Sequence, residues 1–307
     1  MRSPLNKRLF RELRGEFGKY LVIFILMTLT IGMVSGFLVA DGSMIQAYEE
    51  SFEKYSIENG HFRTEKKMNN AQIQDIEDLG IKLYENYYVE EALTNGSTMR
   101  IFKNCDEVNK VCLMKGKMPE KPGEIGIDRM YADNNNLSVG DEIESGGHTW
   151  KITGLVALSD YSALFSNNND SMFDSVKFGV SVVCPEEFDS YKADQLNYSY
   201  AWKYNTEPKN EKAEKDISED LMEDVAKEVT LEEFVPRYTN QAIIFTGDDM
   251  GGDRSMMIVL LYIIIVIMAF VFAITTSNTI RKEANVIGTL RASGYTRGEL
   301  IRHYMAA

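Results

Sequence analysis

Two long apolar runs interrupt an otherwise polar chain. Residues 21–40 and 256–276 contain no charged side chain. Each run is close to the roughly 20 residues that a helix needs to cross a hydrocarbon layer of about 30 Å. The pattern therefore predicts a first transmembrane helix at residues 21–40 and a second at residues 255–276.

The segment between the two runs alternates between strand-like and helical patterns. Residues 41–60 continue the first run as a helix, with Tyr48, Phe52 and Tyr55 along one face, until Asn59-Gly60 ends it. Beyond it we expect three helices, which begin at Asn69/Asn70, begin at Pro185 and cover residues 210–229, the last of them charged. We expect strands at 81–89, 97–102 and 176–184, and hairpins within 113–165 with turns at Gly140-Asp141 and Gly146-Gly147. Residues 41–254 are thus predicted to form one α+β domain.

The same patterns predict which side chains face the interior. In the first of these helices we expect Ile73, Ile76 and Leu79 to point inward. In the charged helix we expect an inner face made of Ile217, Leu221, Met222 and Val225. Residues 246–253 (TGDDMGGD) are predicted as a loop that re-enters the membrane. Its three aspartates are a candidate cation site, but they lack the EF-hand spacing and its terminal glutamate, so a solvated linker is favoured.

Charge fixes the expected topology. Residues 1–40 carry +4 and residues 255–307 carry +3, whereas the whole chain carries −13, so residues 41–254 carry −20. Basic segments that flank membrane helices stay in the cytoplasm. We therefore expect a multi-pass protein of the cell membrane with both ends of this segment cytoplasmic and the acidic domain outside the cytoplasm.

The first twenty residues combine basic side chains with an apolar stripe. Leu5, Leu9, Leu13 and Phe17 recur at helical spacing, which predicts a cytoplasmic amphipathic elbow helix lying on the lipid surface at residues 1–20. A plain basic segment that only orients the first span is the alternative. A cleavable signal peptide is disfavoured, because the apolar run is longer than usual and a small-x-small cleavage site is missing.

The segment after the second run carries a recognisable motif. Glu283, Gly288, Leu290-Arg291-Ala292, Gly294-Tyr295 and Glu299-Leu300 resemble the pattern that follows the second span of the MacB/FtsX-like ABC transporter permeases. The resemblance implies that residues 277–307 are a coupling-helix segment that docks in a cleft of a cytoplasmic ATPase subunit. The expected docking residues are Glu283, Gly288, Leu290, Arg291, Gly294, Tyr295 and Arg297.

Each of these residue types suits an interface. The two arginines offer forked donors to carboxylates, and Leu290 and Tyr295 offer apolar anchors. Gly288 and Gly294 indicate a bend or a close backbone approach. The alternative is that the arginines only contact lipid phosphates.

A second match lies in the outer domain. Gly116, Met118-Pro119, Pro122-Gly123-Glu124, Val139-Gly140-Asp141 and residues 150–156 resemble the outer core domain of the same permeases. Asp128, Asp141 and His148 within this stretch are predicted to be turn and surface residues. Members of the family carry two further spans, so we expect this chain to be the N-terminal part of a longer permease.

The resemblance implies a function in transport without catalysis by this chain. The expected partners are a cytoplasmic ABC ATPase, a second permease copy or homologous half, and the lipid membrane, and an extracytoplasmic peptide or accessory protein is a further candidate. Export of peptides, lipids or drugs and regulation of cell-wall hydrolases both remain open. A two-span sensor shares the topology but needs a signalling helix with heptads after the second span, and residues 283–300 lack one.

Other chemistry is missing from the sequence. It contains no phosphate-binding loop, no G-x-G-x-x-G, no H-E-x-x-H and no G-x-S-x-G. We expect no catalytic residue, no metal, no cofactor and no nucleic-acid partner. Cys105 and Cys112 either pair across a hairpin, leaving Cys184 free, or remain reduced.

Overall fold

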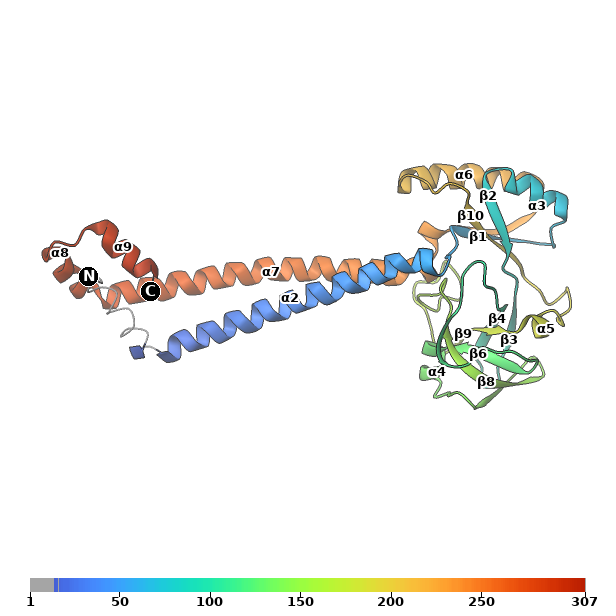
Figure 1. Cartoon of the computed structure of the whole chain (residues 1–307), viewed down its shortest axis with the longest axis horizontal. Coiled ribbons are helices and arrows are strands. Elements are labelled where there is room, and N and C mark those ends of the chain that lie inside the picture. Colours follow the sequence, from blue (N-terminus) through green and yellow to red (C-terminus); the bar gives the residue numbers. More distant parts are fainter. Residues whose placement is uncertain (1–13, 16, 307) are drawn as a thin grey trace. The chain divides into compact units, whose positions relative to one another are not determined.

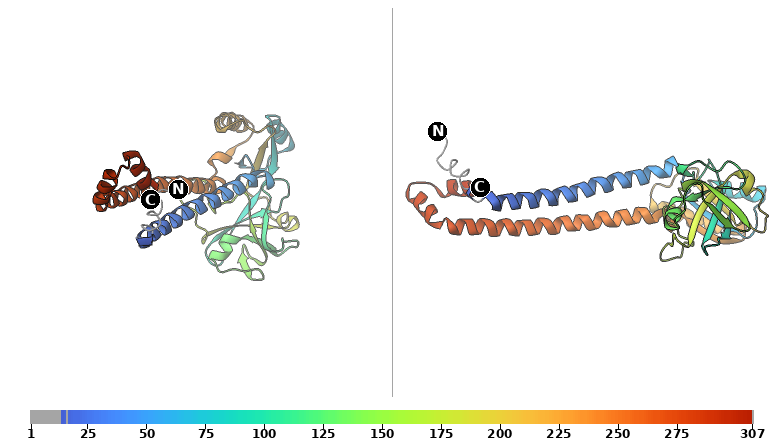
Figure 2. Two further views of the ribbon diagram at one scale, coloured as in Figure 1. Left: turned by 60° about the vertical axis from the view of Figure 1, so that its left-hand side comes forward. Right: turned by 90° about the horizontal axis from the view of Figure 1, so that it is seen from below.

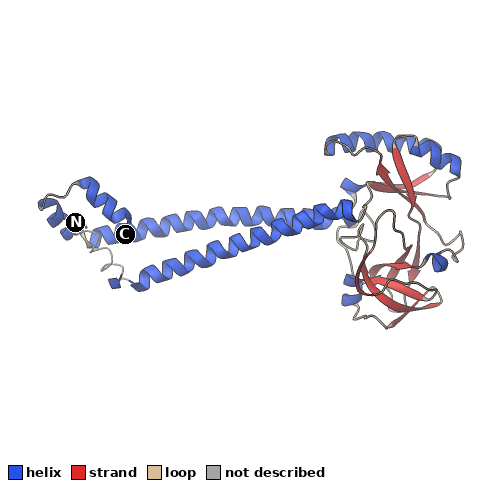
Figure 3. Ribbon diagram, viewed as in Figure 1, coloured by secondary structure: helices blue, strands red, loops and turns tan. Residues whose placement is uncertain are grey.

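The computed structural model describes residues 14–15 and 17–306 (Figure 1). Two compact units divide the chain: the membrane unit comprises the residues up to Met44 and from Met250 onward, and the outer unit comprises Ile45–Asp249. Of the predicted amphipathic helix, residues 1–13 and 16 lie outside the described part of the chain. All strands of the described residues belong to the outer unit (Figure 3).

Two long helices contain the apolar runs. Helix α2 covers Phe17–Lys54 and helix α7 covers Gln241–Lys282, and both are long and apolar enough to cross a membrane. Their apolar side chains are exposed, with Phe24 and Phe270 each 66% accessible, as expected for residues that face lipid. The two predicted apolar helices are therefore present. Helix α7 is followed by α8 (Ala284–Ala292) and α9 (Arg297–Ala306).

Helix α7 corrects the prediction of a loop at residues 246–253. It is uninterrupted through this stretch, and Figure 2 shows it as one helix in both views. A Cβ atom at Gly247 would lie 2.6 Å from Cε1 of Tyr48, whose hydroxyl donates to the Ile243 carbonyl at 3.0 Å. Gly247 thus lets the α2 side chain reach the α7 backbone, and this packing offsets the roughly 1 kcal/mol by which glycine disfavours a helix.

The outer unit contains a four-stranded antiparallel sheet in the order β11-β1-β10-β2. The strands cover Gly60–Thr64 (β1), Ile81–Glu85 (β2), Tyr198–Tyr204 (β10) and Leu231–Pro236 (β11). Helices α3 (Asn70–Glu77) and α6 (Glu211–Glu228) lie beside it (Figure 1). Aromatic side chains form its buried layer, with Trp202 stacked on Phe234 at 4.8 Å between ring centroids.

A seven-stranded mixed sheet is inserted between β2 and β10. Its order is β3-β4-β9-β6-β8-β5, with β7 paired to β8. The strands cover Tyr88–Ala92 (β3), Thr98–Lys103 (β4), Cys112–Gly116 (β5), Glu124–Asp128 (β6), Glu142–Ser145 (β7), His148–Ala157 (β8) and Phe178–Val183 (β9). The short helices α4 (Arg129–Asn134) and α5 (Pro185–Phe188) follow β6 and β9. Together the two sheets and their helices make the predicted α+β domain.

Several details differ from the predictions. The single strand expected at 81–89 is two strands, β2 and β3, which belong to different sheets. Leu79, Ile217 and Met222 are exposed, each more than 40%, although they were expected to point inward. The sequence analysis also missed β10 and β11, which together with β1 and β2 build the four-stranded sheet.

Candidate functional sites

The motif residues after α7 form a tight turn between α8 and α9. Gly294 has a φ of 97°, a left-handed conformation that glycine adopts without strain. Its N–H donates to the Arg291 carbonyl at 3.2 Å, and the Tyr295 N–H donates to the Leu290 carbonyl at 3.2 Å. These two hydrogen bonds make a Schellman motif. In this motif the residues at the positions of Leu290 and Tyr295 commonly form a hydrophobic contact, which explains why both are apolar.

Helix α9 begins directly after this turn. Thr296 and Glu299 form a capping box: the Thr296 N–H donates to Glu299 Oε2 at 2.9 Å, and the Glu299 N–H donates to Thr296 Oγ1 at 3.3 Å. The hydrogen bond from the Thr296 backbone lowers the pKa of the Glu299 carboxyl. Arg297 is the first residue of α9, and its side chain is exposed.

The remaining predicted docking residues lie on α8. Glu283 occupies the N-cap position of α8 without a capping hydrogen bond from its side chain, and its carboxylate accepts a hydrogen bond from the Tyr304 hydroxyl of α9. Arg291 is exposed in the last turn. Gly288 is inside the helix, and apart from its two neighbours and the backbone of its own helix, no atom of the described residues lies within 4 Å of where its Cβ would stand. The bend predicted from the glycines is therefore at Gly294, whereas no described residue approaches Gly288.

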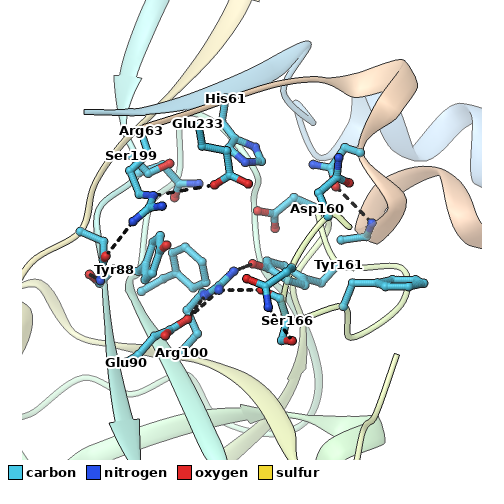
Figure 4. Close-up of a pocket in the computed structure, with 18 residues that line it drawn as sticks. His61, Arg63, Tyr88, Glu90, Arg100, Asp160, Tyr161, Ser166, Ser199 and Glu233 are labelled. Atoms are coloured by element: carbon cyan, nitrogen blue, oxygen red, sulfur yellow. Dashed lines mark hydrogen bonds and ion pairs between the residues drawn. The ribbon is translucent and has the colours of Figure 1, made fainter. Parts of the chain in front are cut away.

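A second candidate site is a polar cavity of about 200 Å³ inside the outer unit (Figure 4). It lies between the two sheets: β1, β10 and β11 contribute one wall, and β3 and β4 contribute the other. The loop after β8 and the residues around the start of α7 complete its lining. Only Phe102, Phe165 and Ala242 among the lining residues are wholly apolar. Such a lining suits a polar ligand rather than a lipid.

Arg100 of β4 organises one wall. Its guanidinium donates to Glu90 Oε1 at 2.6 Å, to the Tyr161 hydroxyl at 2.7 Å and to the Ser166 carbonyl at 2.9 Å. It also lies over the Tyr88 ring, 4.5 Å from the centroid. Because most of its donors are occupied, Arg100 fixes the loop of residues 158–168 onto β3 and β4.

A buried polar cluster lies behind the opposite wall. His61 Nδ1 lies 2.6 Å from Glu58 Oε1, and the Asn109 side-chain amide donates to Glu58 Oε2 at 2.7 Å and to Asp160 Oδ2 at 3.2 Å. Burial raises the pKa of Asp160 to about 7, and the Glu58 charge adds to this effect. Burial lowers the pKa of His61, but the Glu58 carboxylate outweighs it, so the net shift is upward.

Arg63 of β1 stands at the edge of the same cavity. Its Nη1 atom pairs with Glu232 Oε2 at 2.9 Å, and its Nε atom is 3.7 Å from Glu233 Oε2. The second distance is too long for a hydrogen bond, and Nε is a buried donor that has no acceptor among the described residues. Figure 4 shows Arg63 and Asp160 on opposite sides of the cavity.

Sequence reasoning did not find this cavity. Its lining comes from seven separate segments, and none of them carries a recognisable motif. It also placed Asp128 wrongly at the surface: the side chain is buried, accepts from the N–H groups of Met130 and Tyr131 to cap α4, and has a pKa raised to about 6 by burial. Asp141 and His148 are exposed, as predicted.

The cysteines and the acidic side chains form neither cross-links nor metal-binding clusters in the described part of the chain. All three cysteines are free thiols, so the alternative of a Cys105–Cys112 disulfide is not what the structure shows; Cys184 is buried. The described residues contain no group of three or more His, Cys, Asp or Glu side chains that could hold a metal ion.

No family model matches the sequence, and no curated protein matches it. Among solved structures, the chain is similar to the extracellular domain of the noncanonic ABC-type transporter YknZ from Gram-positive bacteria. The identity is 12%, the match covers 55% of this chain and 92% of that domain, and the TM-score is 0.31. It is also similar to the periplasmic region of MacB from Actinobacillus actinomycetemcomitans, with 12% identity, coverage of 55% and 85%, and a TM-score of 0.30.

Proposed function

We propose that this chain is the permease subunit of an ABC transporter of the MacB/FtsX type. The observation that carries the proposal is the pair of sequence matches, at residues 116–156 and 283–300, which occur in family order on either side of the second apolar run. ATP hydrolysis belongs to a separate cytoplasmic ATPase, and a second permease copy or homologous half completes the transporter. Its task is export of, or resistance to, peptides, lipids or drugs.

The geometry of the α8–α9 turn supports ATPase docking. The Schellman motif and the capping box give the segment a defined shape without help from a partner, so an ATPase cleft would meet a preorganised surface. Arg291 and Arg297 are exposed on either side of the turn. We therefore assign Glu283, Gly288, Leu290, Arg291, Gly294, Tyr295 and Arg297 to the docking segment.

The continuity of α7 supports a mechanical role. The helix runs without a break from Gln241 to Lys282, and Glu283, the first residue of the docking segment, follows it directly. At its other end, Gln241 donates from its N–H and its side chain to Asn168 at 2.8 and 2.7 Å. The Ser162 hydroxyl is 2.9 Å from the Ala242 and Ile243 carbonyls. A displacement of α7 would therefore move the loop of residues 158–168.

The loop passes the motion on to the seven-stranded sheet. Tyr161 and Ser166 both accept hydrogen bonds from Arg100, which is itself anchored to Glu90. The rings of Phe165 and Phe173 pack against Phe245 of α7 at 5.5 and 5.4 Å between centroids. In this proposal, ATP-driven motion enters at the docking segment, travels along α7 and reshapes the outer unit.

The docking test compares two substitutions at one position. Gly294→Val disfavours the left-handed conformation, whereas Gly294→Asn tolerates it, so only the valine variant should disrupt the turn. We expect Gly294→Val and Leu290→Asp to abolish co-purification of an ABC ATPase from host membranes, with Gly294→Asn retaining it. Membrane insertion should be equal in all three variants. Equal ATPase recovery with every variant would refute docking through this turn.

A further inference from the structure

Two sulfur atoms meet on an edge strand of the seven-stranded sheet. Cys112 and Met114 belong to β5, which follows β8 as the last strand in the order of that sheet. The Cys112 thiol lies 3.9 Å from the Met114 sulfur. Cys112 is partly exposed and Met114 is 51% exposed. The pair therefore lies at the surface of the outer unit rather than in its core.

A β-bulge coincides with this sulfur contact. The register between β5 and β8 shifts between Leu113 and Lys115, so Met114 is an extra residue without a partner on β8. A bulge re-aims the side chain of the extra residue, and bulges are common at sheet edges and next to functional sites. The backbone irregularity and the sulfur contact thus occur at the same residue.

The chain before β5 holds the cysteine in place. The Lys110 N–H donates to the Tyr55 carbonyl at 2.9 Å, and the Tyr55 hydroxyl donates to Cys112 Sγ at 3.3 Å. A hydrogen bond donated to an ionisable group favours its anionic form. The hydroxyl therefore favours the thiolate of Cys112, and the thiolate is the form of cysteine that binds metal ions.

The spacing of the two sulfur atoms fits one metal ion between them. Metal–thiolate bonds in protein sites are about 2.3 Å long. Two bonds of this length span the separation of 3.9 Å with an S–metal–S angle of about 115°. This angle lies between the tetrahedral and the trigonal value, so a further ligand from solvent or from a metal carrier completes the coordination.

The types of donor select the metal. Thiolate and thioether sulfur are soft ligands that suit Cu(I), whereas carboxylate, carbonyl and water oxygen suit Mg²⁺, Ca²⁺ and Mn²⁺. Zn²⁺ sites use three or four Cys, His or carboxylate ligands, and the described residues contain no such group of three. A pair made of one thiol and one thioether therefore favours a soft monovalent ion.

We infer that Cys112 and Met114 form a surface site for a soft monovalent metal ion, Cu(I) or Ag(I). The ion binds between Cys112 Sγ and Met114 Sδ, and the thiol releases its proton to solvent as the metal–sulfur bond forms. The inference does not depend on the proposed transport function, because both residues belong to the outer unit. No metal was expected from the sequence, because a Cys-x-Met pair matches neither a zinc spacing nor a calcium loop.

The test measures metal binding by the reduced whole chain in lipid nanodiscs. The starting chain carries Cys105→Ser; of its two remaining cysteines Cys184 is buried, so Cys112 is the accessible thiol. Cu(I) is supplied without oxygen as its coloured bicinchoninate complex, and loss of the colour reports transfer to the protein. We expect transfer of one Cu(I) per chain. Ag(I) should compete for the site, whereas a large excess of Zn²⁺ or Ca²⁺ should not.

Variants of the starting chain test each sulfur atom separately. Cys112→Ser should abolish the transfer of Cu(I). Met114→Leu conserves the side-chain volume and removes the thioether, so it should weaken Cu(I) binding at least about tenfold. Met172→Leu is the matched control, because Met172 is 79% exposed and lies outside β5. It should bind Cu(I) like the starting chain.

Alkylation of the thiol gives a second measurement that needs no change at either sulfur. One equivalent of Ag(I) should protect Cys112 of the starting chain from iodoacetamide. Protection should be weaker in Met114→Leu and unchanged in Met172→Leu. Equal unfolding midpoints of the metal-free variants, measured by tryptophan fluorescence, show that a loss of binding is not a loss of folding.

Several results would overturn the inference. Equal Cu(I) affinity of Met114→Leu and Met172→Leu would show that the thiol alone holds the ion. Transfer of no Cu(I) to the starting chain, or unchanged transfer to Cys112→Ser, would show that the pair is not the site. Displacement of Cu(I) by Zn²⁺, or a lack of protection by Ag(I), would contradict the selection of a soft ion.

Discussion

The stability of the outer unit should fall as the pH rises from 5 to 8, and Asp160 should be a main cause. Its carboxyl is buried beside Glu58, which raises its pKa from 3.8 to about 7. Below pH 7 the folded state therefore holds a proton that the unfolded state has already released. A state that binds more protons is favoured at low pH, so the folded state loses stability as the pH increases through this range.

The magnitude follows from the two pKa values. Each unit of difference corresponds to about 1.4 kcal/mol, so ionisation of Asp160 costs the folded state up to about 4 kcal/mol between pH 4 and pH 7. His61 acts in the same direction: its pKa is raised in the fold, so its contribution is complete below pH 6.5 and is lost as the pH rises through the folded value. Asp128, with a pKa raised to about 6, adds to the lower part of the range.

Asp160→Asn isolates the contribution of this one carboxyl. An asparagine oxygen can still accept from Asn109, but it carries no charge at any pH. We expect the variant to be more stable than the unchanged chain at pH 8 and the difference to shrink towards pH 5. The contribution of Asp128 cancels when the two profiles are subtracted, whereas that of His61 cancels only in part, because the Asp160 charge is one of the causes that raise the pKa of His61.

Tryptophan fluorescence measures this transition in the whole chain. Trp150 and Trp202 are the only two tryptophans, both are fully buried, and both lie in the outer unit. Their emission therefore reports unfolding of that unit even when the membrane helices remain inserted. Thermal and denaturant unfolding in nanodiscs at pH 5, 6, 7 and 8 gives the profile. A difference between variant and unchanged chain that is constant over this range would refute the reasoning.

Two further predictions concern the helices. The first uses a chain whose cysteines are replaced by serine and an impermeant thiol reagent added to intact cells. The reagent should label Met172→Cys, because Met172 is 79% exposed in the outer unit, and should label Ser277→Cys only after permeabilisation. Labelling of Ser277→Cys in intact cells contradicts the topology. Gly247→Leu should lower the free energy of unfolding measured by tryptophan fluorescence by roughly 1–3 kcal/mol, because the new side chain overlaps Tyr48. Gly251→Ala should not lower this free energy, because the space around Gly251 is open. Equal effects of the two substitutions would show that the Tyr48 contact does not matter.

Local signals explain which parts of the fold were predictable. The two apolar helices follow from hydrophobic length alone. The β7–β8 hairpin follows from Gly146-Gly147, both of which have a positive φ. The start of α3 follows from Asn69, which forms a capping box with Gln72. In each of these elements a few adjacent residues determine the structure.

Tertiary contacts decided the parts that were missed. Residues 246–253 look like a loop in the sequence. They form a helix because Gly247 packs against Tyr48, a residue about 200 positions earlier in the chain. The run 81–89 looks like one strand, but the chain changes sheets within it. Among the cavity residues, only His61 gave a signal, as one of three histidines, and a scattered histidine did not reveal that Glu58, Asn109 and Asp160 would gather around it.

Three consecutive residues connect the cavity to α7. Asp160 lines the cavity, the Tyr161 hydroxyl accepts from Arg100, and the Ser162 hydroxyl lies against the first carbonyls of α7. Consecutive Cα atoms are held about 3.8 Å apart by the covalent backbone, so a displacement of Ser162 also displaces Asp160, two residues away. Motion of α7 would therefore change the distance between Asp160 on the loop and Arg63 on β1. In the proposed transport mechanism, this loop is therefore the part of the outer unit that moves.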